Sequence, residues 1–119
     1  NSISGTMPSE MGNLEVLKSL SMGGNKLTGT LPTELGRLVV LDDLLLARNT
    51  FIGTIPTEFG NLNQLQQLEL TASELIGPIP VQIGNMTSLR RIDLVANRLQ
   101  GSIPNQIGSL QYLGTFIPT

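Results

Sequence analysis

The sequence lacks cysteine and histidine altogether. Without these residues the chain has no thiol nucleophile, no imidazole base, no disulfide and no zinc site of the usual Cys/His kind. Aromatic residues make up only 3% of the 119 residues and tryptophan is absent, whereas hydrophobic residues make up 39%. A core must therefore be built from Leu, Ile, Met and Val, and we expect neither enzyme activity nor a metal or other cofactor.

The chain also has little charge and no long hydrophobic run. Its seven basic and nine acidic residues give a formal net charge of −2, and among the basic residues only Arg90 and Arg91 are adjacent. Phosphate binding needs a concentrated basic surface, so nucleic acid is not expected as a partner. No apolar stretch approaches the roughly 18 residues that a transmembrane helix requires, so we predict no membrane span in this segment.

What the sequence does contain is a repeat with a period of 24 residues. Three columns of proline and glycine keep this spacing: Pro8, Pro32, Pro56, Pro80 and Pro104; Gly5, Gly29, Gly53, Gly77 and Gly101; Gly12, Gly36, Gly60, Gly84 and Gly108. Seven apolar positions per unit keep the same register, as in Leu41, Leu44, Leu46, Phe51, Ile55, Phe59 and Leu62. A single unit cannot bury its own apolar side chains, so the units have to stack on one another.

The spacing within a unit predicts its local structure. Apolar residues two apart, such as Leu44 and Leu46, are typical of a strand with one buried face, and they place a short strand near the start of each unit. Pro32 and its equivalents have no N–H to donate and therefore interrupt any regular α-helix. The segment 33–38 then has room for one or two helical turns, which we expect a glycine to end.

Stacked about 4.8 Å apart, these units would form a parallel sheet. A column of asparagines falls where the chain turns inward, and each amide can bond backbone groups of two adjacent coils. This structural ladder consists of Asn1, Asn25, Asn49 and Asn97. Ser73 takes the place of asparagine in one unit, so we expect a weaker connection there.

In this register the unit is L-x-x-L-x-L-x-x-N-x-L-x-G-x-I-P-x-x-L-G-x-L-x-x, which resembles the plant-specific class of leucine-rich repeat. The resemblance covers a partial repeat at 1–16, full repeats at 17–40, 41–64, 65–88 and 89–112, and a partial repeat at 113–119. It implies an α/β fold, namely a right-handed leucine-rich repeat solenoid of about five coils. A parallel β-sheet would line the concave face, with short 3-10 or α turns on the other side.

The resemblance also implies a function. Proteins with this repeat include receptor-like kinase ectodomains, receptor-like proteins without a kinase, and secreted inhibitors of cell-wall hydrolases such as polygalacturonase. Typical members carry cysteine-paired caps at both ends, which this chain lacks, so we expect it to be part of a longer protein. The implied location is extracellular or at the cell surface.

Two functions remain open at this point. The first is non-catalytic recognition of a protein or peptide, or of a cell-wall polysaccharide or its hydrolase, through the concave sheet. The alternative is a structural subunit packed within a larger assembly. The two differ in where partners make contact, because recognition predicts contacts on the concave sheet and assembly predicts contacts elsewhere.

The candidate ligand-binding residues are the exposed positions of the strand segments. They are Ser19, Ser21, Asp43, Leu45, Arg48, Gln67, Glu69, Thr71, Arg91, Asp93 and Val95. For any one of these residues, a solvated side chain without a function is an equally good interpretation. Leu45 stands out because its equivalents in the other units are polar, and an exposed leucine can anchor a contact.

Two adjacent pairs of charged residues suggest chemistry that we do not predict. Asp42 and Asp43 could form a carboxylate pair, but neighbouring side chains on a strand diverge and need not converge on one substrate atom. Arg90 and Arg91 could hold an anion, yet Asp93 nearby and Glu69 one coil away favour ordinary ion pairing.

Two surface motifs complete the candidates. The column Thr6, Thr30, Thr54, Pro78 and Ser102 includes one coil, Thr28-Gly29-Thr30, that resembles the spaced threonines of ice-binding solenoids. Only that coil has both threonines and Pro78 interrupts the column, so strand-forming residues in a second, minor sheet explain it better. The tripeptide Asn85-Met86-Thr87 matches the acceptor pattern for an N-linked glycan, which makes Asn85 a glycosylation candidate.

Overall fold

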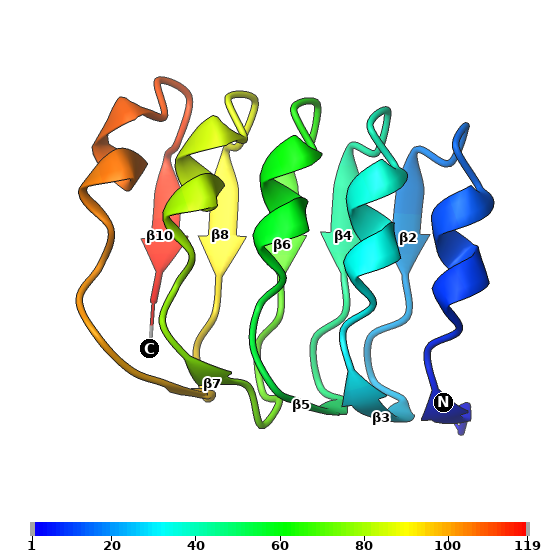
Figure 1. Ribbon diagram of the computed structural model, residues 1–119. Helices are drawn as coiled ribbons and strands as arrows, with labels where there is room; N and C mark the ends of the chain where they lie inside the picture. Colours follow the sequence, from blue (N-terminus) through cyan, green and yellow to red (C-terminus); the bar gives the residue numbers. More distant parts are fainter. Residues whose placement is uncertain (1, 119) are drawn as a thin grey trace.

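Each 24-residue unit forms one coil, and the coils stand side by side in a row (Figure 1). The computed structural model describes residues 2–118, which fill a slab of 37 × 31 × 20 Å. In Figure 1 the strands of one sheet lie behind a row of short helices, and the strands of two smaller sheets run along the lower edge. The predicted solenoid with parallel strands and short turns is therefore confirmed.

The major sheet is parallel and takes one strand from each coil. Its strand order is β10-β8-β6-β4-β2, and the register places Leu20, Leu44, Leu68 and Ile92 next to one another. The strands are β2 (Ser19–Ser21), β4 (Asp43–Leu45), β6 (Gln67–Glu69), β8 (Arg91–Asp93) and β10 (Thr115–Ile117). Each ends after three residues because the chain then turns into the next side of the coil.

The minor strands form two smaller parallel sheets. One contains β1 (Ser4–Thr6), β3 (Lys26–Thr30) and β5 (Thr50–Ile52), and the other contains β7 (Ile76–Gly77) and β9 (Arg98–Leu99). Pro78, which has no N–H to donate, follows β7 directly. Thr6 and Thr30 lie within these strands, as the strand-forming interpretation of the threonine column predicts, whereas Thr54 and Ser102 of the same column lie outside them.

The side opposite the major sheet consists of 3-10 helices, each starting after a column proline. They are η1 (Ser9–Asn13), η2 (Thr33–Arg37), η3 (Thr57–Asn61), η4 (Val81–Asn85) and η5 (Asn105–Ser109). The expectation that a glycine ends each turn is wrong, because Gly36 lies inside η2. A Cβ at Gly36 would lie 2.5 Å from the carbonyl oxygen of Glu58, so glycine is required for close approach of adjacent coils.

The core is a thin aliphatic layer between the major sheet and the 3-10 helices. In the unit 41–64 the side chains at the seven apolar positions of the repeat are at most 3% exposed, and Phe51 and Phe59 are the largest of them. The prediction of seven buried positions per unit fails at Ile103, which is 50% exposed. Its coil packs against a neighbouring coil on one side only among residues 2–118, so the column is not covered there.

The asparagine ladder connects successive coils. Asn49 donates from Nδ2 to the carbonyl oxygens of Leu46 in its own coil and Met22 in the preceding coil, both at 3.0 Å. Its Oδ1 accepts from the N–H of Leu27 at 3.0 Å. Asn97 makes the three equivalent bonds, and Asn25 donates to Met22 in its own coil and accepts from the N–H of Ile3, whereas Asn1 lies outside the described residues. At Ser73 the buried hydroxyl makes no hydrogen bond, so this position does not link its coil to the preceding one.

None of the helices in residues 2–118 combines the length and the apolar character needed to cross a lipid bilayer.

Candidate functional site

The outward side of the major sheet, which we call the open face, presents side chains in straight rows across the strands. Because alternate residues of a strand point to opposite sides, the buried leucines are flanked by two outward positions. The first row is Ser19, Asp43, Gln67, Arg91 and Thr115, and the second row is Ser21, Leu45, Glu69, Asp93 and Ile117. Eight of the predicted ligand-binding residues therefore lie together in these two rows.

The remaining predicted residues follow the strands. Thr71 and Val95 lie two residues beyond the ends of β6 and β8 and are partly exposed. Arg48 is exposed and has a φ of 57°, in the left-handed region. Ala72 and Ala96, at equivalent positions, have φ values of 55° and 57°, so the sharp turn after the strand is a property of the repeat.

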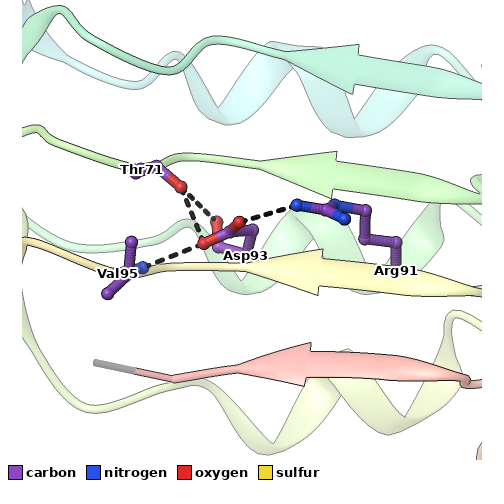
Figure 2. Close-up of polar contacts among 4 residues, drawn as sticks. All are labelled: Thr71, Arg91, Asp93 and Val95. Carbon is purple, nitrogen blue, oxygen red and sulfur yellow. Dashed lines mark hydrogen bonds and ion pairs between the residues drawn. The ribbon is translucent and has the colours of Figure 1, made fainter.

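Asp93 differs from the prediction, because its side chain is covered rather than exposed. The residue is 6% exposed, and its Oδ1 accepts hydrogen bonds from Thr71 Oγ1 at 2.8 Å and from the N–H of Val95 at 3.3 Å. Its Oδ2 accepts from Arg91 Nη2 at 2.9 Å (Figure 2). Thr71 belongs to the preceding coil, so this carboxylate connects two coils at the open face.

These contacts stabilise the ionised form of Asp93. Burial of the carboxyl group acts to raise its pKa, but the hydrogen bonds from Thr71, Val95 and Arg91 and the charge of Arg91 act in the other direction. The pKa of Asp93 is therefore lowered from its ordinary value. The carboxylate is already engaged within the fold and is not an open ligand for a partner. The ion pairing favoured for Arg91 is present, at 2.9 Å.

The other charged residues of the open face behave differently. Asp43 and Glu69 are partly exposed, and their carboxylates make neither a hydrogen bond nor an ion pair within residues 2–118. The ion pairs in this part of the chain are Arg91–Asp93 and Arg98–Glu74, so Glu69 pairs with neither Arg90 nor Arg91. The unused groups are therefore available to a molecule that approaches the sheet.

Acid–base and metal chemistry find no support in the described residues. Asp42 and Asp43 are consecutive, and no third His, Cys, Asp or Glu joins them in an arrangement that could hold a metal ion within 2–118. Leu45 is partly exposed in the second row between Ser21 and Glu69, and Ile117 ends the same row, so the open face combines apolar side chains with polar neighbours. This arrangement can bind by complementarity but offers no activated nucleophile.

The link between Thr71 and Asp93 was not recognised in the sequence, although a signal for it exists. The two residues are 22 apart, and the same offset joins Asn25 to Ile3, Asn49 to Leu27 and Asn97 to Leu75. An offset of one period less two residues therefore marks side chains that reach the preceding coil. Applied to pairs of polar residues, it would have found this contact.

A second surface lies on the minor sheets. Ile52, Ile76 and Val81 are each about half exposed, at 50%, 47% and 51%. Beside them is a groove of about 360 Å³, lined by Thr54, Ile55, Thr57, Pro78, Ile79, Pro80, Val81 and Gln82. A smaller groove of about 320 Å³ occupies the equivalent place near Thr6 and Thr30. Both grooves lie away from the open face of the major sheet.

The glycosylation candidate Asn85 is exposed at the end of η4. Its carbonyl oxygen accepts a hydrogen bond from the N–H of Thr87 at 3.0 Å, so the tripeptide forms a tight turn. Because η4 lies on the side of the coil opposite β8, a glycan on Asn85 would leave the open face uncovered.

The comparisons with known proteins agree with this geometry. The sequence profile of the Leucine Rich Repeat family matches residues 16–38 and 88–110. No curated protein sequence matches the chain.

Several solved structures of plant receptors are similar to the chain. One is the plant peptide hormone receptor RGFR1 in complex with RGF2, with 38% identity, a TM-score of 0.97, and coverage of 98% of this chain and 19% of that one. Another is the Arabidopsis receptor kinase HAESA with the peptide hormone IDA and the co-receptor SERK1, with 43% identity, a TM-score of 0.93 and coverage of 96% and 19%. The leucine-rich repeat ectodomain of the receptor kinase SOBIR1 from Arabidopsis thaliana has 31% identity, a TM-score of 0.88 and coverage of 94% and 61%.

Proposed function

Because the chain is an array of leucine-rich repeats like those of plant receptor-kinase ectodomains, we propose that it is a non-catalytic recognition module. Its partner is a peptide or a protein segment that binds across the open face of the major sheet. The chain spans about a fifth of the peptide hormone receptors that it matches, so partners of the whole protein are part of this proposal.

The observation that carries the proposal is the set of unused side chains on the open face. The side chains of Asp43, Gln67 and Glu69 make no hydrogen bond or ion pair with the rest of residues 2–118, and Leu45 adds partly exposed apolar surface among them. In a small interface, an apolar anchor surrounded by polar groups supplies both affinity and orientation. The core does not need any of these side chains for packing. We therefore assign them to contact with a partner.

The similar structures support the same reading of the partner. RGFR1 is a plant peptide hormone receptor whose structure contains RGF2. The structure of HAESA contains the peptide hormone IDA and the co-receptor SERK1. A location outside the cell follows for this chain by resemblance to ectodomains of plant membrane receptors, and the exposed acceptor tripeptide at Asn85 is compatible with it.

The proposal is tested by selecting binders from a displayed library of random peptides and mapping them with two matched variants. Leu45→Glu places a charge on the open face, and Ile76→Glu places the same charge on the minor sheet. We expect selected peptides to lose binding to Leu45→Glu by tenfold or more and to retain binding to Ile76→Glu. Binding that is lost only in Ile76→Glu would contradict the proposal, as would a library that yields no binder.

A second candidate function is packing within a larger assembly. The observation in its favour is the exposure of the apolar residues Ile52, Ile76 and Val81, each about half exposed, of which Val81 also lines the groove of about 360 Å³. Exposed apolar surface of this kind can mark a contact with another subunit. The same pair of variants separates the two functions, because packing within an assembly predicts that Ile76→Glu, and not Leu45→Glu, weakens binding of the partner.

A further inference from the structure

Opposite charges occupy the first row of the open face at a fixed separation. Asp43 on β4, Gln67 on β6 and Arg91 on β8 are aligned by the register of the sheet, so the acidic and the basic residue lie two strands apart. Figure 1 shows these three strands side by side. Neighbouring strands are about 4.8 Å apart, which separates Asp43 from Arg91 by about 9.6 Å along the row.

The surrounding charges reinforce this polarity. Asp42 precedes Asp43, and Glu69 lies one strand further on in the second row, so the part of the face over β4 and β6 is acidic. Arg90 precedes Arg91, so the part over β8 is basic. Asp93 reduces that basic charge because it is paired with Arg91. The guanidinium of Arg91 still has further N–H donors, and its side chain is 45% exposed.

The separation of about 9.6 Å selects among backbone conformations of a bound peptide. In a β-strand, side chains on the same face recur every two residues, at about 6.7 Å and then about 13 Å. In a polyproline II helix, the chain rises about 3.1 Å per residue with three residues per turn, so side chains three apart point the same way at about 9.3 Å. The polyproline II spacing matches the row and the β-strand spacing does not.

We propose that the open face binds a peptide in the polyproline II conformation that carries a basic and an acidic side chain three residues apart. The basic side chain pairs with Asp43 and the acidic side chain pairs with Arg91 and Arg90. This inference rests on the proposed function, because it names the chemistry of the partner at the same surface. A polyproline II segment is already ordered before it binds, which lowers the entropy cost of binding to a nearly flat sheet.

The test uses three synthetic peptides with blocked ends that differ only in the spacing of the charges. Each contains one lysine and one glutamate within a run of prolines, separated by one, two or three prolines. The peptide with two intervening prolines places the charges three residues apart. We expect it to bind at least tenfold more tightly than the other two in isothermal titration calorimetry at low ionic strength, since salt screens exposed ion pairs.

Two protein variants with the same change in net charge provide the control. Asp43→Lys should weaken binding of the peptide with two intervening prolines by fivefold or more. The same variant should improve binding of a peptide that has glutamate in place of the lysine. Glu58→Lys changes the same charge on η3, away from the open face, and should leave binding unchanged.

Equal affinity of the three spacings, or equal loss in Asp43→Lys and Glu58→Lys, would overturn the inference. If none of the proline peptides binds while library peptides still depend on Leu45, the inference fails and the proposed function stands. If no peptide of either kind binds at the open face, both fail.

Discussion

Replacing Ser73 with asparagine should strengthen the array at the one described position where its asparagine ladder is interrupted. Shifting the contacts of Asn49 by one period identifies the missing bonds. An asparagine at 73 would donate to the carbonyl oxygens of Leu46 and Leu70 and accept from the N–H of Phe51. In the present chain the hydroxyl of Ser73 is buried and makes no hydrogen bond.

The expected gain follows from these bonds. Each buried hydrogen bond contributes roughly 0.5–1.5 kcal/mol net, and ordering the longer side chain offsets about 1 kcal/mol. Removing a buried hydroxyl without a partner adds a further contribution of the same order. We therefore expect Ser73→Asn to raise the free energy of unfolding by about 1–5 kcal/mol, which corresponds to a rise in Tm of roughly 4–20 °C for a chain of this size.

The assay combines thermal unfolding with hydrogen exchange. The amides of Leu27 and Leu75, which donate to asparagine side chains, serve as internal references for the amide of Phe51. In the wild type the Phe51 amide should exchange faster than both, and in Ser73→Asn it should approach them. Ser73→Ala is the control, since it removes the hydroxyl without adding an amide. An equal gain in Ser73→Ala, or no change at Phe51, would refute the reasoning.

Three further predictions concern the coil contacts and the surface. Gly36→Ala should cost roughly 1–3 kcal/mol in urea unfolding, because its Cβ would lie 2.5 Å from a backbone oxygen of the next coil. Gly108→Ala, which has no atom within 4 Å of its Cβ, should be neutral, and equal effects would contradict this role. Asp93→Asn should be less stable than the wild type at pH 7. Because the pKa of Asp93 is lowered in the folded state, its carboxylate contributes stability above the unfolded pKa of about 3.9 and loses that contribution as the pH falls further. The difference in free energy of unfolding between the wild type and Asp93→Asn should therefore be smaller at pH 3 than at pH 7. A difference that does not change with pH would contradict this role of Asp93. Mass spectrometry of chain secreted from eukaryotic cells should find a glycan on Asn85, and Asn63→Thr should create a second site one coil earlier. Modification of the new site alone would contradict the proposal for Asn85.

The sequence predicts the fold well because the fold is a consequence of its period. The step of 24 residues fixes which side chains stack, so Leu20, Leu44 and Leu68 could be placed in one buried column before any coordinates were known. The helical turns were harder to predict, since the role of Gly36 depends on the distance between coils. A sequence indicates that glycine is needed there, but only the approach of Glu58 shows why.

The open face was predicted less completely, for a different physical reason. Its positions follow from the register, yet the interactions among them depend on which pairs of side chains differ from the repeat. Thr71 and Asp93 occupy positions where the other units have no matching pair, so the repeat places the two residues on adjacent coils but does not show that their side chains bond. That contact changes Asp93 from a presumed ligand into a group that holds Arg91 in place.

This difference also explains why the repeat alone cannot name a partner. The inward columns contribute the stability of the array, and residues there are restricted to apolar side chains of suitable size. The outward rows contribute little to stability, so they can vary without loss of the fold. Information about the partner must therefore lie in departures from the repeat, and on the open face the strongest departure is the alignment of Asp43 with Arg91 across β6. If charge-spaced peptides bind there, the partner is encoded in those few positions and can be changed by exchanging them while the core stays as it is.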